Sequence, residues 1–384
     1  MAKRRANGEG SIRKRADGRW EGRYVAGHDA NGKPIRKNVL GKSQAEVREK
    51  LQRAIIETRG LDVARSDEFT VGTWAKTWFE IYAKPNIRPS TADYYNRFIE
   101  SYIVPQLGHI KLNKLTGRDI QKMYNEVKAN GRSKGPKRDK DPGLSSSTVR
   151  GVHMMFHNCL DRAVKEKLIP SNPSEDCIIP KLQKKEMKIL LPEHVGSYLK
   201  AAEERGVLPM FFLELTTGLR KGEIVALLWK DLDLKNKTLT VSKQAVWNRD
   251  EKRLEITRPK TETSIRRISV PQETIDLLLK EHAKHPSNPY MFPSPLTGEM
   301  YHPDSIVNIH KKILKDAGLE HIRFHDLRHT FATFALQNGV DVKTVSSMLG
   351  HFSAGFTLNT YAHATNWMQE EAAEKMGAFV SQAM

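Results

Sequence analysis

The spacing of apolar and polar residues divides the chain into three zones. In the first zone, two short apolar runs at 20–25 and 35–40 lie on either side of the dipeptide Asn31-Gly32. An Asn-Gly pair between two such runs is a strong hairpin signal, because both residues tolerate the left-handed backbone of a tight turn. We therefore predict two antiparallel strands near the N-terminus.

A helix is expected to follow this hairpin. Ser43 is a suitable N-cap, Glu46 stands three residues later as in a capping box, and Gly60 is a natural terminator. The pattern predicts a small β-sheet with one helix over residues 1–64, followed by a connector at 65–68.

The second zone, residues 69–170, has the periodicity of helices. Trp74, Trp78 and Tyr82 recur every four residues, which is typical of a helix face that packs into a core. The stretch 131–143 is rich in glycine, proline and charge, and is predicted to be a loop. That loop either contacts a phosphate backbone or is a solvated connection. The zone as a whole predicts an all-α domain.

The third zone, residues 188–384, follows a connector at 171–187 and mixes helical with strand-like patterns. It predicts a helix–glycine turn–helix, three strands and then mainly helices, so the fold class is a multidomain chain with a mixed α+β third domain. Its later helices are expected at about 272–284, 303–317, 326–338, 341–350 and 357–363, with a final amphipathic stretch at 366–380.

Composition limits the cellular context. No apolar run is long enough to span a membrane, and the first residues, MAKRRANGEGSIRKR, lack the apolar stretch of a signal peptide. The only cysteines, Cys159 and Cys177, fit neither a metal site nor a disulfide framework. We expect a protein of the cytoplasm that binds no metal and needs no cofactor.

Charge indicates the kind of partner. The 384 residues contain 63 Lys+Arg against 45 Asp+Glu, a formal net charge of +18. Such an excess favours a polyanionic partner such as nucleic acid, although a basic protein can also use its charge only for solubility. The first 64 residues hold an excess of 8 positive charges, with five basic residues on or near the predicted sheet. A β-ribbon can enter the major groove of DNA, so these five are candidate DNA-binding residues: Arg13, Lys14, Arg15, Arg19 and Arg23.

The stretch HDLRHTFAT at 325–333 brings basic side chains to a predicted helix N-terminus. His325 and Arg328 are three residues apart and share one helical face, while apolar residues mark the opposite face. Backbone N–H groups and the helix dipole at this end also favour an anion. Taken alone, the pair is a weak motif and is better explained as surface polar residues.

Two further motifs carry basic residues. In TTGLRKGEI, Arg220 follows a glycine turn, where a guanidinium can bind two phosphate oxygens. Glu223 stands three residues later, and either holds this arginine or is an ordinary acid of a first helical turn. In TRPKTET, Lys260 is expected in the turn of a β-hairpin, where it is either solvated or reaches into a groove.

Two motifs near the C-terminus complete the set. In MLGH, His351 comes just after a helix that ends at Gly350. In TLNTYAH, Tyr361 lies ten residues after His351.

The ordered set resembles the tyrosine recombinase family, the integrases of phages and mobile elements such as conjugative transposons. The resemblance covers about 175 residues at the C-terminal end, and each position of the family pattern is filled in order: Arg220, Lys260, His325, Arg328, His351 and Tyr361. It implies an arm-type DNA-binding domain at 1–64, a helical core-binding domain at 69–170 and a catalytic domain with a C-terminal tail at 188–384.

The resemblance also implies roles for the six residues. Arg220 and Arg328 would bind the scissile phosphate, with a further hydrogen bond from His351. Tyr361 would be the nucleophile, and Lys260 would protonate the departing 5′ oxygen. His325 would be either the proton acceptor or a phosphate ligand.

The implied activity is site-specific DNA integration and excision through a 3′-phosphotyrosine intermediate and a Holliday junction, without ATP or metal. The implied partners are double-stranded DNA at core and arm sites, three further copies of the chain in a tetramer, and accessory DNA-bending or excision proteins. The tail after Tyr361 either folds on its own domain or docks on a neighbouring subunit. His329 is expected either to support a residue that contacts the phosphate or to pack, and His363 has no required role.

Three other functions compete with this interpretation. A type IB topoisomerase shares the tyrosine, arginine and histidine chemistry, but DNA relaxation does not need a second DNA-binding domain. A housekeeping recombinase that resolves chromosomes usually lacks the N-terminal domain. A DNA-binding regulator without catalysis does not explain why all six positions are filled.

Overall fold

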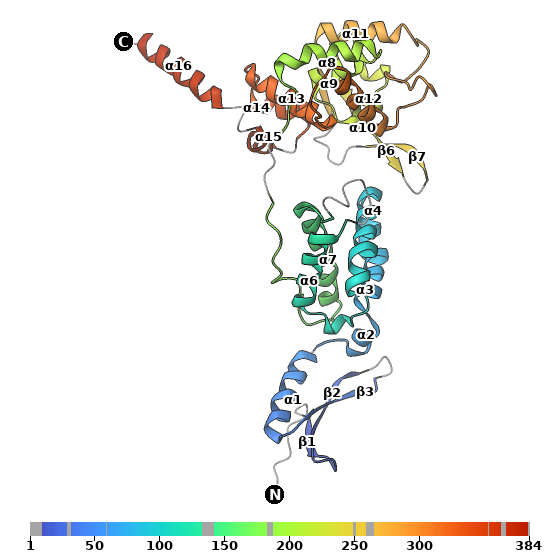
Figure 1. Cartoon of the computed structure of the whole chain (residues 1–384), viewed down its shortest axis with the longest axis vertical. Helices are drawn as coiled ribbons and strands as arrows, with labels where there is room; N and C mark the ends of the chain where they lie inside the picture. The colour runs from blue at the N-terminus through green and yellow to red at the C-terminus, as the bar shows by residue number, and fades with distance from the viewer. Residues whose placement is uncertain are drawn as a thin grey trace. The chain divides into compact units, whose positions relative to one another are not determined.

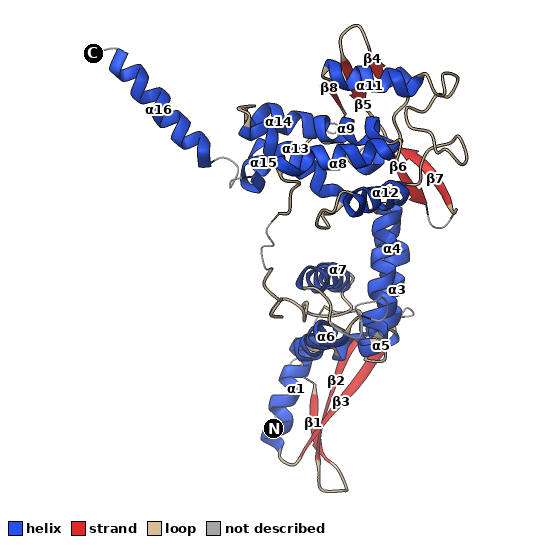
Figure 2. Ribbon diagram, turned by 45° about the horizontal axis from the view of Figure 1, so that its top comes forward, coloured by secondary structure: helices blue, strands red, loops and turns tan. Residues whose placement is uncertain are grey.

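The structure is a computed structural model in which the chain forms two compact units, residues 1–184 and 185–384, each described here by itself. The residues described are 10–28, 32–58, 60–132, 142–182, 187–248, 251–258, 265–351, 353–361 and 366–382. Figures 1 and 2 show the helices and strands of both units.

The first unit begins with a three-stranded antiparallel sheet in the order β1-β2-β3, covered on one face by α1. The elements are β1 (Ser11–Lys14), β2 (Trp20–His28), β3 (Pro34–Gly41) and α1 (Gln44–Thr58). Gly22 lets the helix approach the sheet closely, since a Cβ there would lie 2.9 Å from Val47 Cγ1. The Ser43 hydroxyl accepts a hydrogen bond from the Glu46 amide at 3.2 Å, as the cap requires. The predicted sheet and helix are confirmed.

The connector expected at 65–68 is instead part of a helix, α2 (Val63–Glu68), which has Asp62 as its N-cap. This helix is fixed on two sides: Ser66 Oγ donates to the Leu168 carbonyl at 2.7 Å, and Lys37 Nζ pairs with Asp67 at 2.7 Å. The charged composition of the segment indicated a linker, but long-range polar contacts hold it in place.

The rest of the unit is helical, as predicted. The helices are α3 (Val71–Trp78), α4 (Pro89–Phe98), α5 (Val104–Leu107), α6 (Gly117–Asn130) and α7 (Ser146–Lys165). Trp74 and Trp78 are buried in their common core, and Tyr82 packs against it. Trp74 Nε1 donates to the Cys159 carbonyl at 3.0 Å, so the indole joins α3 to α7 by packing and by a hydrogen bond. The aromatic stripe is a core stripe.

The second unit is mixed α+β and mainly helical. Its elements are α8 (Pro192–Glu204), α9 (Leu208–Thr217), α10 (Lys221–Val225), β4 (Leu232–Asp233), β5 (Thr238–Val241), β6 (Gln244–Asn248), β7 (Arg253–Thr257), β8 (Arg266–Ser269), α11 (Gln272–His282), α12 (Pro303–Asp316), α13 (Phe324–Gln337), α14 (Val342–Leu349), α15 (Ala354–Tyr361) and α16 (Asn366–Gln382). The apolar helix α9 packs against α8, α11 and α13. Its Phe211 and the Leu327 side chain of α13 are fully buried in the shared core. Within the described ranges, no helix is both long and apolar enough to cross a membrane.

The strands of this unit pair differently from the prediction. Strand β7 pairs with β6 as a hairpin, whereas β8 pairs with β5 in a separate sheet of order β4-β5-β8. Lys260 lies outside the described residues, in the segment between β7 and β8. The strands on its two sides belong to different sheets, so they do not form the hairpin in which the sequence placed Lys260.

Substituting Trp74 by Ala tests the core of the first unit. We expect a loss of about 3–5 kcal/mol in the free energy of unfolding, because a fully buried aromatic side chain and its hydrogen bond are removed. Met154→Ala on α7 is the matched control, since the Met154 side chain is 65% exposed and its loss should change stability by at most about 0.5 kcal/mol. Urea unfolding followed by circular dichroism measures the free energy of unfolding of both variants. Similar losses for the two would contradict the assignment of Trp74 to the core of the first unit.

Candidate active site

Two helices of the second unit end at glycines with left-handed backbone. Gly218 ends α9 with φ +62°, and Gly350 ends α14 with φ +64°. An L-residue is strained in this conformation, and a Cβ at Gly218 would also lie only 2.5 Å from Phe331. The sharp turn after each glycine positions a candidate catalytic side chain, Arg220 after the first and His351 after the second.

Arg328 joins these two turns. Its Nη1 donates to the Gly218 carbonyl at 2.7 Å, and its Nη2 donates to the Leu349 carbonyl at 2.6 Å. Carbonyls at helix C-termini lack intrahelical partners and carry the negative end of the helix dipole, so a guanidinium satisfies both. We predicted that the basic face of α13 points away from the core, but Arg328 is only 2% exposed. Burial lowers its pKa to about 10, and the charge of Arg220 acts in the same direction, yet Arg328 is still protonated at neutral pH.

Arg220 is held by a buried carboxylate. Its Nη1 donates to Glu223 Oε1 at 2.8 Å, and its backbone N–H donates to Glu223 Oε2 at 2.9 Å. The sequence left two roles open for Glu223, and it has both, because it caps α10 and orients the arginine. Burial alone would raise the pKa of Glu223, but the hydrogen bonds and charge of Arg266, with the charge of Arg220, lower it to about 2.

Arg266 on β8 is a further member of this network. Its Nη2 pairs with Glu223 Oε2 at 2.8 Å, and its Nε donates to the Met348 carbonyl in the last turn of α14. Sequence reasoning missed Arg266, although a signal was present. Arg266 shares the inward face of its strand with the buried Ile268, and a charged residue at such a position requires a partner.

Two imidazoles are neutral despite the cations around them. Burial, followed by the neighbouring His329 and Arg328, lowers the pKa of His325 to about 4. Burial, followed by Arg328 and Arg220, lowers the pKa of His351 to about 3. A hydrogen bond of 2.7 Å joins His351 Nδ1 to the Thr357 hydroxyl of α15, which fixes the ring. At neutral pH, both rings can donate or accept a hydrogen bond without adding positive charge.

Tyr361 ends α15 and is 2% exposed. It packs in a small apolar cluster with Phe331 and Leu349. Burial raises the pKa of its phenol to about 12, and the charge of Arg328 opposes this rise, so the phenol lies within electrostatic reach of that guanidinium. The phenol oxygen is 2.8 Å from His329 Nδ1. His329, which we expected to support another site residue or to pack, is therefore a direct partner of the candidate nucleophile.

Glu214 on α9 was not singled out from the sequence, because it lies in an apolar helix. It is fully buried, and neither carboxyl oxygen has a hydrogen-bond partner. Burial raises the pKa of Glu214 well above its ordinary value, against the opposing charge of Arg328. This raised pKa favours the neutral form of Glu214, which would add no negative charge that competes with a bound anion for the arginines.

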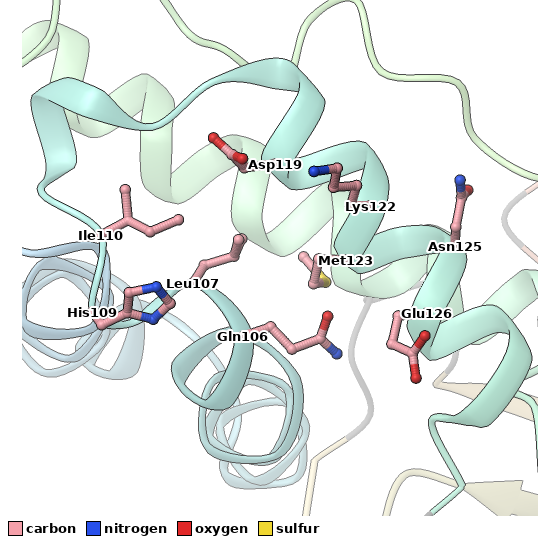
Figure 3. Close-up of a pocket in the computed structure, with 9 residues that line it drawn as sticks. All are labelled: Gln106, Leu107, His109, Ile110, Asp119, Lys122, Met123, Asn125 and Glu126. Atoms are coloured by element: carbon pink, nitrogen blue, oxygen red, sulfur yellow. The ribbon is translucent and has the colours of Figure 1, made fainter.

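The structure thus brings five of the six predicted residues into one site: Arg220, His325, Arg328, His351 and Tyr361. Lys260 and His363 lie outside the described residues. The hollow shown in Figure 3 belongs to the first unit, between α5 and α6, and none of the six lines it.

The five predicted DNA-binding residues lie at one end of the N-terminal sheet. Arg13 and Arg23 both contact Glu21, at 2.7 Å and 3.3 Å, and the Glu21 carboxylate is nearly inaccessible beneath them. Arg19 forms an ion pair with Asp17 at 2.8 Å in the turn between β1 and β2. Arg15 opens the same turn, and Lys14 ends β1. The arginine side chains themselves stay largely exposed.

Replacing Gly218 by Ala tests the turn on which Arg328 depends. A left-handed alanine costs about 1–2 kcal/mol, and we expect roughly a further 1–3 kcal/mol because the new Cβ meets Phe331 and Leu349. Gly339→Ala is the control, since Gly339 has φ +80° with open space around a Cβ. Equal losses in the free energy of unfolding, measured by urea denaturation, would show that close packing at Gly218 is unimportant.

Comparison with protein families identifies two regions. Residues 183–367 match the phage integrase family, and residues 70–128 match the N-terminal SAM-like domain of phage integrases. These two matches cover the second unit as far as residue 367 and much of the helical part of the first.

Several known proteins align with nearly the whole chain. A XerC-like tyrosine recombinase of Caldanaerobacter subterraneus is 29% identical, over 91% of this chain and 93% of its own length. The ICEBs1 integrase of Bacillus subtilis is 27% identical, over 95% of this chain and 99% of its own.

Solved structures show the same fold. The Tn1549 transposon integrase in complex with a circular intermediate DNA superposes with a TM-score of 0.67 at 20% identity, over 80% of this chain and 99% of that chain. A lambda integrase dimer bound to a core site gives a TM-score of 0.56 at 17% identity, over 94% and 96% of the two chains. The family matches over residues 70–128 and 183–367, with relatives that align over nearly the whole chain, place the chain in the phage integrase family, and it is a tyrosine recombinase.

Proposed function

We propose that this chain is the site-specific recombinase of a mobile element, which integrates and excises that element by cleaving and rejoining DNA strands. The observation that carries the proposal is the position of Arg328. This single side chain ties together the turns that carry Arg220 and His351, and lies within electrostatic reach of the Tyr361 phenol.

The arrangement suits the chemistry of a DNA phosphodiester. Its anionic oxygens repel a nucleophile, and the charge grows in the transition state. Arg220 and Arg328 supply fixed positive charge, and Glu223 and the two helix ends hold them in place before DNA arrives. Such preorganised donors are worth about 10²–10³ in rate each. The neutral His351 and His325 add hydrogen bonds to the same phosphate.

Strand cleavage would proceed by attack of the Tyr361 oxygen on phosphorus. The new bond joins the phenol to the 3′ phosphate, and the bond to the 5′ oxygen breaks. Lys260 would give that oxygen its proton, leaving a free 5′-hydroxyl. The hydroxyl of a second strand then attacks the phosphotyrosine, and two such rounds pass through a Holliday junction. Because the phosphotyrosine bond conserves the energy of the phosphodiester, the proposed reaction requires neither ATP nor a metal.

We assign residues 1–64 to an arm-binding domain, 69–170 to a core-binding domain and 188–384 to the catalytic domain with its tail. Arg13 and Arg23, ordered on the first sheet by Glu21, would bind DNA at the arm sites. This second DNA-binding surface favours an integrase over a topoisomerase, because supercoil relaxation requires only one DNA site.

We also propose that the chain acts as a tetramer in the cytoplasm, with accessory DNA-bending or excision proteins. A lambda integrase tetramer has been solved on a Holliday junction. On α16, Met376, Phe379 and Val380 are each more than half exposed. Apolar residues so exposed on a C-terminal helix suit docking on a neighbouring subunit better than packing on the domain to which they belong.

Tyr361→Phe tests the proposed nucleophile. On a nicked duplex containing the ends of the element, the wild-type chain should form a covalent protein–DNA adduct that survives denaturing electrophoresis, and the variant should form none. Tyr301→Phe, which removes a half-buried phenol of the same unit, should retain the adduct. An adduct formed by Tyr361→Phe, or lost in Tyr301→Phe, would exclude Tyr361 as the nucleophile.

The triple variant Arg13→Ala, Lys14→Ala and Arg19→Ala tests the arm surface. We expect weaker binding at a distal DNA site, a shallower salt dependence because fewer phosphates are neutralised, and largely unchanged cleavage at the core site. A matched control removes the same charge from α1, with Arg48, Lys50 and Arg53 changed to Ala. Gel-shift titrations over a range of salt concentrations measure the DNA affinity of both triple variants. If the two variants lost equal affinity, the basic residues of the sheet would contribute only non-specific attraction to DNA.

A further inference from the structure

We propose that His329, and not His325, holds the Tyr361 phenol and takes its proton as the phenol attacks the phosphate. This inference rests on the proposed function, because it assigns a role within the same cleavage step. It selects a histidine that follows the second arginine directly in the sequence and that the motif pattern leaves without a role.

The contact itself is direct. His329 Nδ1 and the Tyr361 hydroxyl are 2.8 Å apart, which is hydrogen-bond distance. The ring centroids lie 5.6 Å apart at an interplanar angle of 59°, so the two rings are tilted rather than stacked. Tyr361 is nearly inaccessible to solvent, and water is therefore a poor alternative acceptor for its proton.

The other basic groups of the site have different partners. His351 Nδ1 is bound to Thr357, and the Nη atoms of Arg328 donate to two carbonyls. His325 lies one turn before His329 on α13, with its ring centroid 5.0 Å from that of His329. His325 is more exposed than His329, so it is better placed for an incoming phosphate than for the buried phenol.

The proton balance requires one tautomer of His329. At neutral pH a phenol is protonated and donates, so Nδ1 must be the acceptor and Nε2 carries the hydrogen. As the phenol oxygen bonds to phosphorus, its proton passes to Nδ1 and His329 becomes an imidazolium. Asp326, three residues earlier on the same helix, is ionised and lies within electrostatic reach, so it stabilises the new charge. The departing 5′ oxygen receives its proton separately, from Lys260 in the proposed mechanism.

The electrostatic surroundings of His329 are mixed. Electrostatic interactions link His329 to Asp326, Arg328 and His325 on its own helix and to Arg323, the N-cap of that helix. From other elements, it interacts with His351 after α14 and with Tyr361 on α15. Burial lowers the pKa of His329, Asp326 opposes this, and the two arginines reinforce it. The ring is therefore neutral and able to accept a proton under ordinary conditions.

The test compares His329→Asn and His329→Phe with the wild-type chain. Asn can keep a hydrogen bond near the position of Nδ1 but takes no proton at neutral pH, and Phe removes both functions. The readout is the single-turnover rate of phosphotyrosine formation on a nicked duplex from about pH 6 to pH 9. Gel shifts on the same DNA confirm that each variant is folded and bound.

We expect both variants to be at least about 10²-fold slower at pH 7, the usual contribution of a positioned general base. Their rates should rise with pH towards the wild-type value, because the fraction of Tyr361 that is already deprotonated grows with pH, while the wild-type rate levels off. His325→Asn should instead lower the rate by a similar factor at every pH, since it removes a phosphate ligand.

Three outcomes would overturn the assignment: full activity of His329→Asn, an unchanged rate in both His329 variants, or faster cleavage without the histidine. Each is distinguishable from failure of the proposed function. If the proposed function were wrong, the wild-type chain itself would form no Tyr361-dependent adduct, whatever residue stands at 329.

Discussion

The active site depends on one buried cation that binds two helix ends. Arg328 donates two hydrogen bonds, to the carbonyls of Gly218 and Leu349, where α9 and α14 end. Without it, the carbonyls of Gly218 and Leu349 would lose a buried donor, and the turns beyond them would lose a shared partner. The same side chain thus builds the site and supplies part of its charge. Its role in holding the two turns cannot be separated from its proposed role in binding a phosphate.

A second layer of ionic contacts keeps this concentration of positive charge stable. Glu223 forms ion pairs with both Arg220 and Arg266, while the raised pKa of Glu214 favours a neutral carboxyl that does not compensate the cations any further. The site keeps a positive excess that a DNA phosphate can neutralise. An additional ionised carboxylate would weaken that attraction, and one fewer would leave arginines repelling one another in a poorly solvated interior.

Much of this organisation could be predicted from the sequence, because it depends on residues that are close together in the chain. Glycines with left-handed backbone end helices in short motifs that can be recognised in the sequence. The turns before Arg220 and His351 are therefore predicted together with the helices around them. The aromatic stripe of Trp74 and Trp78 and the capped helix after Ser43 are likewise set by neighbours in the chain. What could not be predicted depends on contacts between distant segments. Three such features are the burial of Arg328, the pairing of β8 with β5 and the bond between His329 and Tyr361. Each of them joins elements that lie tens of residues apart in the chain.

The near-complete burial of the Tyr361 ring also protects the protein between rounds of reaction. An exposed phenol that sits beside arginines is open to oxidation, nitration and enzymatic modification, and any of these would block the proposed nucleophile. A ring enclosed by Phe331, Leu349 and His329 meets few dissolved reagents. This tyrosine recombinase can therefore keep the Tyr361 phenol chemically intact while no DNA is bound.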